Sequence, residues 1–157
     1  MAEQQDTEED KSFLAVLLSE DDLGAIVRTH LFIDSRLNQL IEEGLVAPKQ
    51  IKLDGLRFPL KVSLAIAMGF VPEPYRHAMM WLNSQRNKFA HNVTAQLTED
   101  DADNFFKSFP AESRQFLGIF DETAPKTKLR SCLSFLYGRL TGLLREARQR
   151  KSAEPKE

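Results

Sequence analysis

Apolar residues recur along this chain three and four residues apart, the spacing of an α-helix, and they almost nowhere alternate with polar residues. Alternation is the pattern of a half-buried strand, so its absence predicts a chain without a β-sheet. The longest stripe lies near the C-terminus and consists of Leu129, Cys132, Leu133, Leu136, Leu140, Leu143, Leu144 and Ala147. A chain of 157 residues is long enough to bury a sizeable core as one domain. We therefore predict an all-α fold, a compact bundle of five to six helices.

Capping residues, glycines and prolines predict where the helices begin and end. The run Ser19-Glu20-Asp21-Asp22 is typical of a helix start and opens a long helix over residues 22–43, which Gly44 ends. Other helices are expected over residues 9–18, 58–68, 71–91, from Thr98 to before Pro110, and from Pro125 onward. We expect a single helical domain over residues 1–157, with residues 1–10 and 150–157 as disordered tails.

The charge balance restricts the class of function. The chain has 21 basic and 23 acidic residues, which argues against a dedicated nucleic-acid coating protein with a strongly basic face. It is compatible with a nuclease, which needs only local positive charge. Residues 1–22 hold eight acids and one lysine, whereas residues 125–157 hold nine basic residues and three acids. The basic segment is either a solvated helix end or an aid to holding RNA, and its role stays open.

Cysteine usage and hydropathy predict the compartment. A single cysteine, Cys132, excludes an intramolecular disulfide framework and favours a reducing compartment. No stretch approaches the ~20 apolar residues of a membrane span, and the first residues are acidic where a signal peptide is basic. We expect a cytoplasmic protein that does not enter a membrane.

Arg86 interrupts an apolar stripe. At ~100° per residue, one face of the helix over residues 71–91 carries Tyr75, Ala78, Met79, Leu82, Phe89 and Ala90. A guanidinium on that face needs a partner, because a bare buried charge is strongly unfavourable. On the helix over residues 22–43, His30 and Asp34 lie one turn apart near the centre of the apolar face. We predict that Asp34 is the counter-ion of Arg86, either as a structural pair that fixes helix register or as part of a functional site.

His91 lies on a different side of the same helix. It is roughly 140° around the helix from Arg86 and ~7.5 Å further along it, on the side of Asn87, Ser84 and His77. The two side chains therefore diverge and do not easily contact one phosphate. They meet only if the helix ends near Ala90 or if two such helices pair across a two-fold axis. By itself, a histidine at this position is also typical of a residue that caps the helix dipole.

An arginine, a polar residue directly after it and a histidine four to six positions further on form the R-x4-6-H motif of the HEPN superfamily. Arg86, Asn87 and His91 fit this motif, near the end of a late helix. The order of elements over residues 20–107 resembles the mannitol-operon-repressor-like branch of that superfamily. This order is a long helix with Asp34, a lysine-containing helix that ends in "AMGF", a proline turn, and the "RNKFAHN" helix.

The resemblance implies a HEPN-like fold and two alternative roles. Many HEPN domains are metal-independent ribonucleases of toxin–antitoxin and other defence systems, with an active cleft between two protomers. By this analogy His91 acts as general base or acid, Arg86 stabilises charge on the phosphate, and Asn87 orients or hydrogen-bonds it. His30, Asp34 and Ser84 are expected as supporting residues. Mannitol-repressor-like proteins are instead regulators, which bind protein partners and need not cleave anything.

Other classes of enzyme find no support in the sequence. The three histidines show no metal-ligand spacing, and no Walker, GxGxxG or GxSxG motif is present, so we expect neither a metal nor a cofactor. Ser84 and His91 lack the third group that would orient a Ser–His pair. Trp81 is expected in a helix–helix contact or a dimer interface. Two hypotheses remain, a homodimeric endoribonuclease acting on RNA and a non-catalytic module, with a cognate antitoxin or a regulatory protein as the further expected partner.

Overall fold

The computed structural model describes residues 2–118 and 125–153, and this part of the chain contains helices and no strand. Seven α-helices follow one another: α1 (Ala2–Ser19), α2 (Asp22–Gly44), α3 (Phe58–Ala67), α4 (Arg76–His91), α5 (Glu99–Lys107), α6 (Ala111–Gly118) and α7 (Pro125–Ala153). Three 3₁₀ turns, η1 (Pro48–Gln50), η2 (Leu53–Gly55) and η3 (Glu73–Tyr75), lie in the connections. The all-α prediction is confirmed. The number of helices is higher than the predicted five to six, because the short α6 follows Pro110 where we expected no helix.

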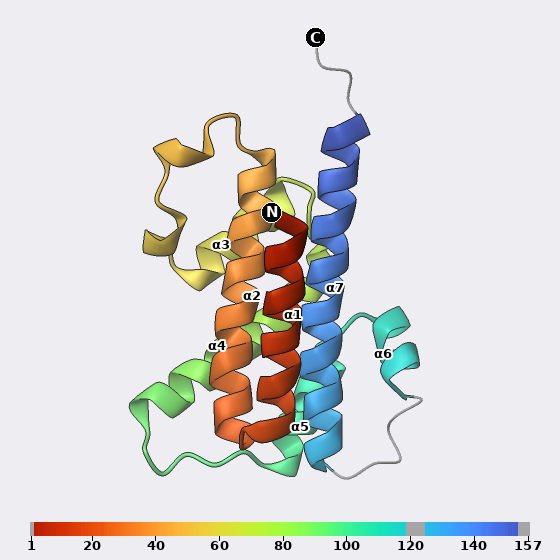
Figure 1. Ribbon diagram of the computed structural model, residues 1–157. Coiled ribbons are helices and arrows are strands. Elements are labelled where there is room, and N and C mark those ends of the chain that lie inside the picture. The colour runs from red at the N-terminus through yellow and green to blue at the C-terminus, as the bar shows by residue number, and fades with distance from the viewer. Residues whose placement is uncertain (1, 119–124, 154–157) are drawn as a thin grey trace.

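Helices α1, α2 and α7 lie side by side along the length of the molecule (Figure 1). The most extensive packing joins α2 to α7, and the other face of α2 packs against α3 and α4. Helix α5 packs against the N-terminal half of α7 and against α4. The core between these helices is built from the apolar stripes that the sequence displays, and every residue of the predicted stripe on α7 is buried. Burial of these faces is the main source of helix stability in a bundle.

Local sequence determines the ends of the helices. Asp21 caps α2, because its carboxylate accepts a hydrogen bond from the backbone N–H of Gly24 at 2.7 Å. Thr98 and Asp101 form a reciprocal capping box at the start of α5. After α3, Gly69 adopts a φ of +76°, a left-handed conformation that favours glycine and turns the chain toward α4. These ends match the boundaries expected from the sequence.

The expected tails are partly helical. Helix α1 begins at Ala2 rather than near residue 9, and α7 continues to Ala153. Residues 2–10 and 150–153 therefore belong to helices, whereas residue 1 and residues 154–157 lie outside the described residues. In the part of the chain that the structure covers, none of the helices combines the length and apolar character that crossing a membrane requires.

Candidate functional site

Helix α4 carries the Arg86–His91 motif and changes environment along its length. Its N-terminal half is packed into the bundle, where Ala78, Met79 and Leu82 are fully buried. Beyond Gln85 no residue of α4 is fully buried: Phe89 packs against the core but is only partly buried, and Ala90 is exposed. In Figure 1 the green C-terminal end of α4 extends outward past α2. The apolar stripe of the sequence therefore continues beyond the core that covers its first half.

Arg86 is half-buried and lies where this change takes place. Its Nη1 donates a hydrogen bond to Asn87 Oδ1 at 3.1 Å. Among the described residues no carboxylate lies within 4.0 Å of its guanidinium. The predicted ion pair between Arg86 and Asp34 is wrong as a direct contact, because α4 leaves the core before Arg86 is enclosed and the carboxylate is engaged elsewhere.

Asp34 pairs with Lys61 of α3. Lys61 Nζ donates to Asp34 Oδ2 at 2.7 Å, and the Lys61 side chain is only 2% exposed. The cation that Asp34 neutralises is thus Lys61 of α3 and not Arg86 of α4. Asp34 keeps a supporting role, but it stabilises the packing of α2 against α3 and does not hold the motif arginine.

His30 lies in the interface of α2 and α4, close enough to Arg86 for the charge of the guanidinium to act on its ring. The ring is 8% exposed, its Nε2 lies 3.1 Å from Asn83 Oδ1, and its Nδ1 is buried without a hydrogen-bond partner among the described residues. Burial lowers the pKa of His30, and the positive charge of Arg86 lowers it further, against the opposing effects of the Asn83 hydrogen bond and Asp34. His30 is therefore a neutral packing residue beside the motif.

The remaining predicted site residues, Asn87, Ser84 and His91, are all exposed. Helix α4 ends at His91, one residue beyond Ala90, and His91 itself is still part of the helix. Arg86 and His91 consequently point to different sides of one regular helix, roughly 140° apart. His91 and Ser84 make no side-chain hydrogen bond within the described part of the chain. The structure brings Arg86 together with Asn87 and His30, and it leaves His91 apart from them.

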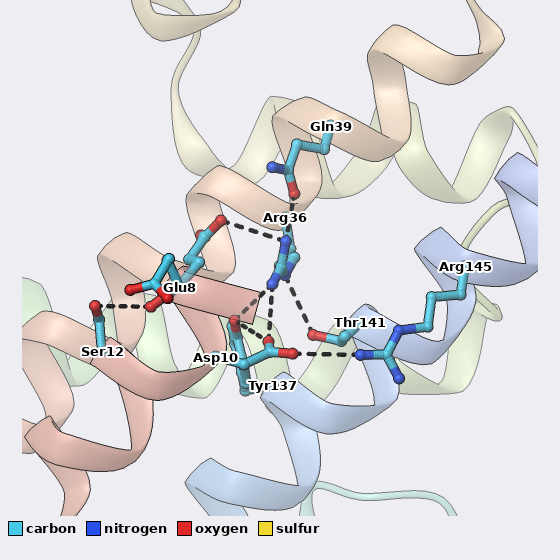
Figure 2. A network of polar contacts seen from close by, with 9 residues as sticks. Glu8, Asp10, Ser12, Arg36, Gln39, Tyr137, Thr141 and Arg145 are labelled. Carbon is cyan, nitrogen blue, oxygen red and sulfur yellow. Dashed lines mark hydrogen bonds and ion pairs between the residues drawn. The ribbon is translucent and has the colours of Figure 1, made fainter. Parts of the chain in front are cut away.

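A second polar cluster surrounds Arg36 of α2 (Figure 2). It was not predicted from the sequence. The Arg36 side chain is completely buried between α1, α2 and α7. It contacts Glu9 Oε2 at 3.3 Å and donates to Asp10 Oδ1 at 3.0 Å and to the Tyr137 hydroxyl at 2.7 Å. Further hydrogen bonds go to Gln39 and Thr141.

This Arg36 cluster, formed by Arg36, Glu9, Asp10, Gln39, Tyr137 and Thr141, holds three helices together. Tyr137 accepts from Arg36 and donates to Asp10 at 2.7 Å, and burial and the nearby Asp10 raise the pKa of the phenol. The sequence does contain a signal for it. Arg36 stands between Ile33 and Leu37 in an apolar stripe, just as Arg86 interrupts the stripe of its own helix.

Comparisons of the chain with protein-family models, with curated proteins and with solved structures find no match. Among the described residues, no group of three or more His, Cys, Asp or Glu side chains is arranged to hold a metal ion.

Proposed function

We propose that this protein is a HEPN-type endoribonuclease that works as a homodimer. One observation carries the proposal: Arg86 is a half-buried guanidinium at the end of α4 that no carboxylate of the described chain neutralises. The structural ion pair on this face belongs to Lys61 and Asp34, so stabilising the fold does not require Arg86 to have a protein anion as partner. Arg86 is available for an external anion, and a planar guanidinium binds phosphate well.

The geometry of α4 supports a site that is shared between two copies of the chain. Arg86 and His91 are on different sides of a regular helix, so one chain does not easily present both to the same phosphate. Two α4 helices paired across a two-fold axis bring His91 of one copy toward Arg86 of the other. Two-fold pairing is the commonest geometry of homo-oligomers. We therefore expect a dimer interface that includes residues 77–91.

The reaction that these side chains support is transesterification of RNA. The ribose 2′-oxygen forms a bond to the adjacent phosphorus while the bond from phosphorus to the leaving 5′-oxygen breaks. His91 removes the proton from the 2′-hydroxyl or donates one to the leaving oxygen, as general base or acid. Arg86 stabilises the charge that develops on the phosphate oxygens, and Asn87 orients its guanidinium through the hydrogen bond at 3.1 Å. The products are a 2′,3′-cyclic phosphate and a 5′-hydroxyl end.

Cleavage of labelled single-stranded RNA in the presence of EDTA tests the proposal. We expect the wild-type protein to leave a 2′,3′-cyclic phosphate, or its hydrolysed product, and His91→Ala to abolish cleavage. His91 is exposed at the end of α4, so this variant should keep the melting temperature. Lys49→Ala, which changes an exposed lysine of η1 outside α4, is the control and should keep activity.

Two results contradict the proposal. Equal cleavage by wild type and His91→Ala indicates a contaminating nuclease. Absence of cleavage by either protein across varied RNAs favours the alternative role, a non-catalytic regulatory module that binds an antitoxin or another protein. Light scattering provides a separate check, because a monomer at tens of micromolar or an interface far from residues 77–91 contradicts the shared site.

A further inference from the structure

A cleft of about 810 Å³ opens between α4, α5 and α6, on a different face of α4 from Arg86. Its wall includes polar and aromatic side chains from three helices: His77, Trp81 and Ser84 of α4, Asn104 and Lys107 of α5, and Arg114 of α6. The volume is within the range of small-ligand sites. The wall is formed by three different helices, so the bundle itself sets its shape.

An aromatic ring forms one side of the cleft. Trp81 stacks on Phe105 with ring centroids 4.1 Å apart and an angle of 9° between the planes. Phe105 is fully buried, whereas Trp81 is half-buried and lines the cleft. The tryptophan therefore has its cover from α5 of the same chain. A ring fixed in this way is a suitable platform for stacking a nucleobase.

Two cations that make no direct ion pair among the described residues lie in the same cleft, although Asp103 of α5 is close enough to Lys107 for the two charges to interact. Most arginines and lysines of the described chain pair with a carboxylate, but Lys107 and Arg114 have none within 4.0 Å. Arg114 Nε is also buried without a hydrogen-bond partner among the described residues. The carboxylate in the cleft wall, Glu73, pairs with Arg76 at 3.0 Å. Two cations and an aromatic face are the features that bind a phosphate and its base.

The cleft leads along α4 toward His91. Residues 77, 81, 84, 88 and 91 lie within about 40° of one line along the helix, and Ser84 is about 10 Å from His91 along the axis. A strand whose base stacks on Trp81 thus continues along exposed side chains to the proposed catalytic histidine. Lys88 on this path pairs with Asp101 at 3.4 Å and is still half-exposed.

We infer that this cleft binds a nucleotide of single-stranded RNA next to the cleavage site. Trp81 stacks on the base, and Lys107 and Arg114 contact the backbone phosphates. Ser84 and Asn104 are in position to hydrogen-bond the sugar or the base. The inference rests on the proposed ribonuclease function and assigns its substrate-binding subsite.

Fluorescence gives a direct test, because Trp81 is the single tryptophan of the chain. The full-length protein is titrated with a short 2′-O-methyl oligouridine, which lacks the 2′-hydroxyl needed for cleavage. We expect saturable quenching of Trp81. Lys107→Gln and Arg114→Gln should each weaken binding about ten-fold, and each should reduce the slope of log K against log[salt] by about 0.7. Lys49→Gln changes an exposed lysine of η1 that has no carboxylate within 4.0 Å among the described residues; it is the matched control and should bind like wild type.

The outcomes separate the subsite from the proposed function. If the oligonucleotide quenches Trp81, both variants weaken this quenching and no RNA is cleaved, the subsite is supported and the ribonuclease function is contradicted. If both variants cleave RNA at the normal rate with an unchanged KM, the ribonuclease function is supported and the subsite is overturned. Failure of the oligonucleotide to bind, or binding without a change in Trp81 fluorescence, also overturns it. Equal quenching by inorganic phosphate or uridine monophosphate shows a small-anion site and overturns the RNA assignment. Because Arg114 is partly buried, thermal melting must show that its variant is folded, and the exposed Lys107 gives an independent result.

Discussion

Two arginines interrupt apolar stripes in this sequence, and the structure places them in opposite environments. Arg36 is completely buried and contacts two carboxylates, a phenol, an amide and a hydroxyl. Arg86 is half-buried and hydrogen-bonds a single neighbouring amide. The difference arises from what covers each helix, because α1 closes over Arg36 whereas the end of α4 extends beyond the bundle. A charged residue in an apolar stripe is therefore structural where another element supplies its partners, and available to a ligand where none does.

The largest expected effect is on the Arg36 side of this comparison. Arg36→Ala should lower the free energy of unfolding by about 3–5 kcal/mol, since it leaves partly buried Glu9 without its cation and leaves Asp10 with only the exposed Arg145. Urea denaturation measures this. Arg28→Ala removes an exposed pair with Glu20 and should change stability by less than about 0.5 kcal/mol. A loss below about 1 kcal/mol for Arg36→Ala would show that the cluster does not hold α1 in place.

A somewhat smaller loss is expected at Asp34. Asp34→Ala should cost about 3 kcal/mol, because the buried ammonium of Lys61 loses its carboxylate. Double-mutant cycles identify the partner. Asp34 and Lys61 should show coupling of about 1 kcal/mol or more, whereas Asp34 and Arg86 should be additive within about 0.5 kcal/mol. Strong coupling between Asp34 and Arg86 would restore the ion pair that the structure does not contain.

Replacing Arg86 should have little effect on stability and a large effect on RNA cleavage, in contrast to Arg36. Arg86→Ala should lower the free energy of unfolding by less than about 1 kcal/mol, because its one hydrogen bond joins it to an exposed neighbour. RNA cleavage should nevertheless fall at least about 100-fold, the usual effect of losing a group that stabilises transition-state charge. Denaturation and cleavage assays on the same preparation measure both quantities. A stability loss above about 2 kcal/mol with intact cleavage would make Arg86 a structural residue.

The sequence predicted those features that depend on neighbouring residues. Helix class, the start of α2 after the run Ser19–Asp22, the cap at Thr98, the turn at Gly69 and the buried stripe of α7 all follow from local patterns. Features that depend on which helix covers which face were not accessible in this way. A helical wheel gives the direction of Arg86 but not the point at which α4 leaves the core, so the wrong counter-ion was assigned to it.

The candidate site shows the same division. The helical wheel predicted that His91 and Asn87 lie on the polar side of the helix, and both are exposed. It also predicted that His91 and Arg86 point in different directions, as they do in α4. The pairing of Lys61 with Asp34 and the cleft beside Trp81 depend on contacts between helices far apart in sequence. Periodicity contains no information about such contacts. The Arg36 cluster additionally depends on Glu9 and Asp10, which lie at the edge of a segment whose acidic composition indicated a frayed end.

The smallest expected effect tests the electrostatic interaction between His30 and Arg86. The folded state lowers the pKa of His30 below its ordinary value of 6.5, first through burial. As the pH falls through this value, the unfolded chain takes up the proton before the folded protein does. The free energy of unfolding should therefore fall as the pH decreases below about 6.5, with the full contribution present above it.

Arg86→Gln removes a positive charge that opposes protonation of His30. The pKa of His30 should therefore rise toward its ordinary value, and the pH dependence of stability should become shallower. An NMR titration of the histidine ring protons measures this, with the three histidines assigned through single substitutions. Arg114→Gln is the matched control, because its guanidinium lies in the cleft between α4, α5 and α6 and does not contribute to the pKa shift of His30. A His30 pKa that stays unchanged or falls in Arg86→Gln would mean that Arg86 points away from α2.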